Sequence, residues 1–193
     1  MSTSPEGTVQ RRLPGDLAMW FFILAELSVF AILILAFAVT QVLRPEVFAE
    51  GRGQLDTSTG LAMTLSLLTA GLLAALAQQK VRQGRSRLAG GLLVLGLLVA
   101  GAYVGIKLGE YGHLVSIGLG LEYSTFFTLY WILTGFHFLH VLLGMVILGW
   151  MALGCWRGAY PAGRQTGFES GVLYWHMVDL IWVVLFPLVY VIR

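Results

Sequence analysis

Five ionisable side chains lie inside stretches that are otherwise apolar. They are Glu26, His137, His140, His176 and Asp179. Ionisable groups within a membrane span are costly and usually face protein, a cavity or a proton pathway. His137 and His140 are three residues apart, as are His176 and Asp179, so each pair projects from one face of a helix. Residues of these types suit a proton relay, ligation of a metal or haem, or hydrogen bonds that fix helix packing.

The metal and haem interpretations receive the least support. A di-metal carboxylate bundle uses four Glu and two His with Glu-x-x-His spacing, and the chain lacks that pattern. A haem between two helices needs facing histidines at matching depth, which His176 and either His137 or His140 supply in principle. Because the di-metal pattern is missing and no haem pair stands out, we expect no metal site. A structural or lipid-contact role is the leading hypothesis, and a proton relay is the alternative.

No catalytic residue is predicted. The chain has no glycine-rich phosphate loop and no nucleophile elbow with a plausible acid and base. Its one cysteine, Cys155, excludes an internal disulfide and a multi-cysteine metal site. The formal net charge of +2 gives no indication of nucleic-acid binding.

Composition fixes the class of protein. Of 193 residues, 58% are apolar and 11% are charged, whereas soluble domains carry about 25% charged residues. This shortage excludes a soluble fold, and the apolar content excludes disorder. A bilayer core needs about 20 apolar residues per helix. The sequence therefore predicts an all-α integral membrane protein with five transmembrane helices.

The predicted spans belong to one membrane domain, residues 16–193, preceded by a cytoplasmic tail, residues 1–15. The five spans are 17–42, 60–79, 88–108, 124–154 and 169–192, and a polar loop is expected over 44–59. The first span begins like a secretory signal peptide. It is longer than the usual 7–15 apolar residues and carries Glu26, which favours a retained helix.

Basic residues predict the orientation. The side with the tail and the loops 80–87 and 155–168 carries eight Lys and Arg, and the opposite side carries four. An excess of basic residues marks the cytoplasmic side, so we expect the N-terminus inside and the C-terminus outside. With this topology and a rise of about 1.5 Å per residue, the five intramembrane ionisable residues fall in one layer in the inner half of the membrane.

Two further features lie on the third span and just beyond it. Lys107 and Glu110 have i, i+3 spacing near the outer boundary, so they are expected to neutralise each other. Gly101, Gly105 and Gly109 form a GxxxGxxxG run, which predicts a face where another backbone packs closely.

The polar motifs resemble a known family. Residues 134–141 (TGFHFLHV), followed by Gly144, and residues 174–182 (YWHMVDLIW) are similar to the signatures of two spans of subunit III of the haem-copper oxidases. Glu110 and Tyr111, followed by residues 124–127, resemble the segment before the histidine pair. Glu26 falls where the family has a carboxylate. The chain resembles the five-helix form of this family. Residues 12–16 and 186–188, together with Lys107, are most similar to the small members associated with nitric oxide reductase (the NorE type).

The resemblance implies an accessory subunit of the bacterial inner membrane that carries no redox cofactor of its own. Such a subunit packs on a haem-containing catalytic subunit and holds phospholipid between its helices. It also implies that Glu26 lies near a lipid cleft and supports proton delivery or stability. The partner is expected to be nitric oxide reductase, with a cytochrome c or quinol terminal oxidase as the alternative. An independent proton channel or transporter, and a membrane redox enzyme with its own haem or metal, are the other hypotheses.

Overall fold

The computed structural model describes residues 16–161 and 165–192, and the predicted tail lies outside this part of the chain. In the described residues, five helices are long and apolar enough to cross a membrane. The elements in chain order are α1 (Leu17–Leu43), α2 (Pro45–Gly53), α3 (Thr57–Arg82), α4 (Ser86–Ser116), α5 (Thr125–Trp156), α6 (Thr166–Phe186) and the π-helical turn η1 (Pro187–Val191).

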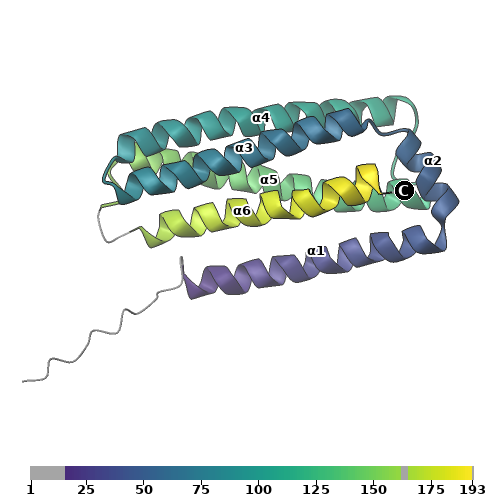
Figure 1. Cartoon of the computed structure of the whole chain (residues 1–193), viewed down its shortest axis with the longest axis horizontal. Coiled ribbons are helices and arrows are strands. Elements are labelled where there is room, and N and C mark those ends of the chain that lie inside the picture. Colours follow the sequence, from purple (N-terminus) through teal and green to yellow (C-terminus); the bar gives the residue numbers. More distant parts are fainter. Residues whose placement is uncertain (1–15, 162–164, 193) are drawn as a thin grey trace, which may run out of the picture.

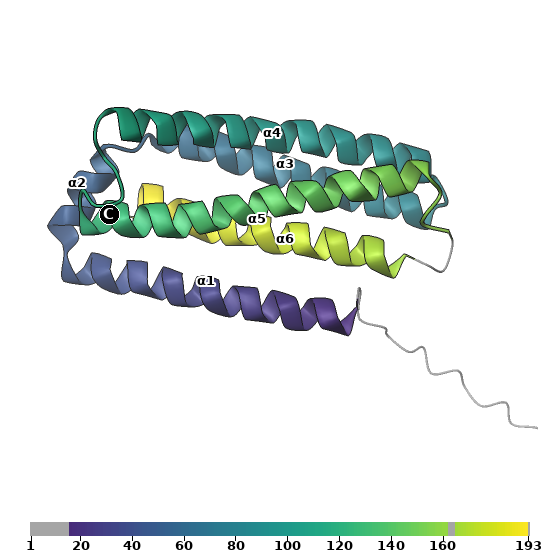
Figure 2. The same cartoon turned by 180° about the vertical axis from the view of Figure 1, so that it is seen from behind.

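The five long helices form one bundle. Figures 1 and 2 show α5 and α6 in its middle, with α1 on one side and α3 and α4 on the other. The short helix α2 crosses one end of the bundle, close to the C-terminus. The helix α1 packs mainly on α5 and α6, whereas α3 and α4 form the most extensive pair. The helix α1 is therefore the most peripheral of the long helices.

The number of long apolar helices confirms the prediction from sequence, but the prediction of one loop is wrong. The expected loop over 44–59 contains α2, which begins at Pro45 and buries Phe48 against Phe37 and Phe126. Proline at the first helical position and Glu46 in the first turn both favour a helix start there. The helix α4 also extends beyond the predicted span 88–108, to Ser116, and carries the Lys107–Glu110 pair.

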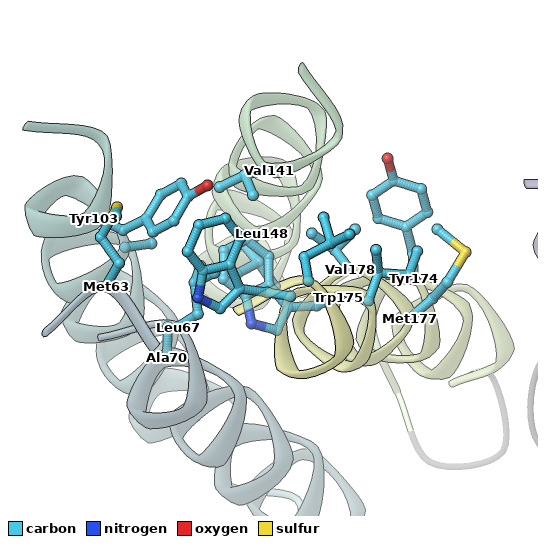
Figure 3. Close-up of a cluster of buried hydrophobic side chains, with 14 of the residues drawn as sticks. Met63, Leu67, Ala70, Tyr103, Val141, Leu148, Tyr174, Trp175, Met177 and Val178 are labelled. Carbon is cyan, nitrogen blue, oxygen red and sulfur yellow. The ribbon is translucent and has the colours of Figure 1, made fainter. Parts of the chain in front are cut away.

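The core lies where α3, α4, α5 and α6 meet. Figure 3 shows side chains from all four helices in contact there, among them Leu67, Tyr103, Leu148 and Trp175. Each of these four side chains is almost fully buried. Lipid tails are as apolar as these side chains, so close van der Waals packing rather than the hydrophobic effect holds the helices together.

The predicted glycine packing face is wrong within the described part of this chain. A Cβ placed on Gly101, Gly105 or Gly109 would meet no atom within 4 Å. The buried face of α4 runs instead through Leu93, Ala100 and other positions that lie around the helix from these glycines. The run therefore has the right spacing but faces away from the neighbouring helices.

Close approaches occur at other glycines, two of which lie on helices that contact α6. A Cβ on Gly144 would lie 2.9 Å from Cε3 of the Trp175 ring, and Gly71 of α3 lies directly against the carboxylate of Asp179. Glycine at these positions leaves room for a large ring and for a polar group between helices. The packing of α6 against α3 and α5 therefore depends on the absence of a side chain at Gly71 and Gly144.

Gly144→Ala should destabilise the protein by about 1–3 kcal/mol, because the added methyl group overlaps a buried ring that has no space to retreat. Gly105→Ala is the matched control. It should be neutral or stabilising by about 0.5–1 kcal/mol, the gain in helix propensity. Thermal unfolding of the purified chain in detergent measures both. Equal unfolding temperatures for the two variants would contradict the packing at the α5–α6 seam.

The helix α3 begins at a well-formed N-cap. The carboxylate of Asp56 accepts hydrogen bonds from the backbone N–H groups of Ser58 and Thr59, both at 3.1 Å. The hydroxyl groups of the same two residues also donate to it. These hydrogen bonds favour the charged form, so they lower the pKa of Asp56 to about 2. The start of α3 is therefore fixed by a charged cap.

This cap predicts an acid-sensitive contribution to stability. The pKa of Asp56 is lower in the folded state than the ordinary value of about 3.9, so the contribution is complete above pH 4 and disappears as the pH falls from about 4 to 2. Asp56→Asn keeps a capping oxygen but removes the charge. The gap between the unfolding temperatures of the wild type and this variant should narrow over that range. A gap that is constant from pH 6 to pH 2 would refute the charged cap.

Candidate functional site

Glu26 and His140 form a polar contact between α1 and α5. Oε2 of Glu26 lies 3.0 Å from Nε2 of His140, and Nδ1 of His140 lies 2.8 Å from the carbonyl oxygen of Phe136. Both imidazole nitrogens thus face oxygen acceptors. A proton must lie between His140 and Glu26, since a neutral imidazole donates through only one nitrogen. The side chains are 11% and 21% exposed, so this proton-holding pair reaches the surface of the bundle.

His137 is fully buried and has a different environment. Its Nε2 lies 3.1 Å from the carbonyl oxygen of Val178 on α6, and its Nδ1 lies 3.3 Å from the hydroxyl of Tyr103 on α4. One nitrogen donates to the carbonyl and the other accepts from the hydroxyl, which satisfies a neutral imidazole completely. His137 therefore links three helices without a buried charge.

His176 and Asp179 pair with each other on α6. Nδ1 of His176 lies 3.2 Å from Oδ2 of Asp179, and the carboxylate packs against Gly71 of α3. The Asp179 side chain is 10% exposed and the His176 side chain is 42% exposed. An imidazole exposed on the outside of a membrane-spanning bundle is costly in lipid. This is consequently the most poorly shielded polar group of the five.

The five predicted residues form three separate groups rather than one cluster. Glu26 contacts His140, while His137 reaches the carbonyl of Val178, the residue before Asp179. These contacts bring α1, α5 and α6 together at one level of the bundle; its depth in a membrane stays a prediction. Across residues 16–161 and 165–192, no three His, Cys, Asp or Glu side chains come together as metal ligands. Both nitrogens of His137 and of His140 are engaged by protein atoms.

A second polar group surrounds Lys107 near the α2 end of the bundle. Nζ of Lys107 lies 2.6 Å from Oε2 of Glu110, which confirms the predicted pair. The same amino group donates to the hydroxyls of Tyr130 and Tyr190, each at 3.0 Å. Both hydroxyls in turn donate to Glu110, at 2.8 and 2.9 Å. Lys107 is 0% exposed, so the ion pair is enclosed by two tyrosines that sequence spacing did not reveal.

Arg52 forms a further buried polar group at this end of the bundle, and the sequence did not predict its role. Its guanidinium group donates to the backbone carbonyls of Leu188 and Val189 and to Oε1 of Gln41. The carbonyls at the end of a helix carry partial negative charge, which suits a cation. Burial lowers the pKa of Arg52 from its ordinary value. Arg52 thereby ties α2 to the C-terminal turn and lines a cavity of about 550 Å³ beside Tyr190.

Breaking the Lys107–Glu110 pair should be strongly destabilising. Lys107→Met leaves the Glu110 carboxylate without its counter-ion in a nearly dry site, at a cost of about 3–5 kcal/mol. The double variant Lys107→Met, Glu110→Gln should recover part of this loss, because no unpaired charge remains. Thermal unfolding in detergent measures both variants.

Lys80→Met is the control for this pair, since the Lys80 amino group makes an exposed 3.5 Å contact with Gln83. Its effect should stay within about 0.5 kcal/mol. A double variant no more stable than Lys107→Met would contradict the enclosed ion pair.

The fold and these polar groups define a class of protein. It is a multi-helix membrane protein whose intramembrane polar side chains mostly hydrogen-bond from one helix to another. The chain belongs to the cytochrome c oxidase subunit III family, whose model matches residues 6–192. The resemblance found in the histidine motifs is therefore confirmed at the level of the family.

Curated relatives carry names from the same family. The chain is 39% identical, over 43% of its length, to cytochrome c oxidase subunit 3 of Thermostichus vulcanus. It is 30% identical, over 69% of its length, to the protein of that name from Lumbricus terrestris. It is also 30% identical, over 90% of its length, to quinol oxidase subunit 3 of Bacillus spizizenii. The matches cover 42%, 50% and 85% of these relatives, so the chain spans half or less of the first two.

Proposed function

We propose that this chain is a non-catalytic accessory subunit of a haem-copper respiratory complex and packs on the catalytic, haem-containing subunit. Family membership across residues 6–192 supports a subunit III role. The observation that carries the non-catalytic assignment is the engagement of both nitrogens of His137 and of His140 by protein atoms. Side chains used in this way fix helices and leave no nitrogen open for a redox metal.

The pair of Glu26 and His140 supports a more specific role. It holds a proton at a position that is partly exposed beside the peripheral helix α1. A carboxylate–imidazole pair that reaches the surface of the bundle suits either proton delivery toward a neighbouring subunit or contact with a phospholipid headgroup. We place the chain in the bacterial inner membrane with its N-terminus inside, as the distribution of basic residues favours.

Two partners are proposed. Nitric oxide reductase is favoured by the NorE-like residues 12–16 and 186–188 and by Lys107. A terminal oxidase is favoured by the names of the relatives, which are subunits of cytochrome c and quinol oxidases. Purification of the complex in mild detergent, followed by spectra and by turnover with nitric oxide and with oxygen, decides between them. A chain that always purifies without a haem-containing partner would end the subunit proposal.

Asp179→Ala should weaken assembly with that partner more than it slows turnover in the complex that remains. The change removes the partner of the exposed His176 imidazole and leaves a gap against Gly71. Ser28→Ala is the control, because the exposed Ser28 hydroxyl bonds only the carbonyl of Leu24 on its own helix. Co-purified haem per chain measures assembly. A complex of the Asp179 variant that assembles normally but has lost turnover would contradict the structural role.

A further inference from the structure

A cavity of about 650 Å³ lies where the turn between α3 and α4 meets the end of α5. Three of its lining residues are Arg85, Arg87 and Arg157, and none of the described lining residues is acidic. Arg85 and Arg87 come from the α3–α4 turn, whereas Arg157 comes from the C-cap of α5, about 70 residues later. The fold thus gathers basic side chains from two separate connections around one cavity.

These arginines have no ion-pair partners in the part of the chain that the structure describes. No carboxylate lies within 4.0 Å of the guanidinium groups of Arg85, Arg87 or Arg157. The neighbouring Arg82, by contrast, forms a 2.8 Å ion pair with Glu169. Within the described residues, these three arginines are thus available to an external anion, whereas Arg82 is neutralised by Glu169.

The rim of the cavity is amphipathic. Trp156 and Leu88 line it and are 52% and 56% exposed. Gly84 and Gly158 also line it and have φ values of +74° and +71°, so the backbone turns sharply on both sides of the arginines. Tryptophan at the end of a membrane helix favours the region of lipid headgroups. Exposed arginines beside an apolar rim match a phosphate that is attached to acyl chains.

We propose that this cavity binds the phosphate of an anionic phospholipid headgroup. Arginine forms paired hydrogen bonds to phosphate oxygens, and basic pockets on the cytoplasmic side of membrane proteins take anionic headgroups. Loops on the cytoplasmic side carry an excess of basic residues in any membrane protein. That rule does not require the arginines of two separate loops to line one cavity. The apolar rim favours a lipid over free phosphate. The inference rests on the orientation in the proposed function, which puts this end of the bundle at the cytoplasmic leaflet.

The test uses the full chain, purified and delipidated in mild detergent, with binding followed by native mass spectrometry. Short-chain phosphatidylglycerol should bind about tenfold more tightly than phosphatidylcholine of the same chain length, and added salt should weaken the difference. Arg87→Gln combined with Arg157→Gln should reduce phosphatidylglycerol affinity about tenfold or more, since each arginine near a phosphate contributes separately. Equal affinity for the two lipids would overturn the site.

The matched control is Lys80→Gln with Arg82→Gln, which removes two positive charges from the same end of the bundle but outside the cavity lining. It should keep the preference for phosphatidylglycerol. Equal losses in both double variants would show a diffuse charge effect and refute the site. Inorganic phosphate that competes as strongly as phosphatidylglycerol would refute the lipid assignment.

Binding to the purified chain does not involve a partner subunit. Failure to co-purify with a haem protein would therefore refute the accessory-subunit proposal and leave the lipid site standing. Equal binding of the two lipids would refute the lipid site and leave the accessory-subunit proposal standing.

Discussion

The structure depends on one constraint: a polar group in a hydrocarbon environment must find its partner inside the protein. An unpaired group there costs several kcal/mol, which is comparable to the stability of a whole domain, about 5–15 kcal/mol. The chain meets this constraint at almost every buried polar side chain. Among the described residues, only Nε1 of Trp175 is buried without a hydrogen-bond partner. Each polar residue kept inside the bundle therefore also specifies which helices lie side by side.

This constraint explains why the helices pack in one arrangement although little free energy favours their association in lipid. Apolar helices in lipid gain little from the hydrophobic effect when they associate, and α1 has few contacts with the rest of the bundle. Its pairing through Glu26 and His140 therefore adds a directional contact to the packing of α1. At the other level, Lys107 and Arg52 hold α4, α5, α2 and the C-terminal turn together. These two polar levels thus involve four of the five long helices, α1, α4, α5 and α6, together with α2.

The same polar residues are the basis of the proposed function. His137 and His140 are engaged in contacts between helices, which supports the proposed accessory role. The Glu26–His140 pair and the basic cavity lie in different parts of the bundle, one beside α1 and the other at the α3–α4 turn. The proposed roles in proton handling and headgroup binding can therefore be tested by separate mutations.

The sequence by itself determined the class, the number of spans, the pairing of Lys107 with Glu110 and the family, because these follow from composition and short-range spacing. It did not determine which partners enclose that pair, since Tyr130 and Tyr190 are 23 and 83 residues from Lys107. It also predicted a packing face at a glycine run that meets no other helix of the described chain, because spacing defines a helix face and not what that face meets. Only tertiary structure decided which faces touch, as helix rotation and neighbours depend on all the contacts together.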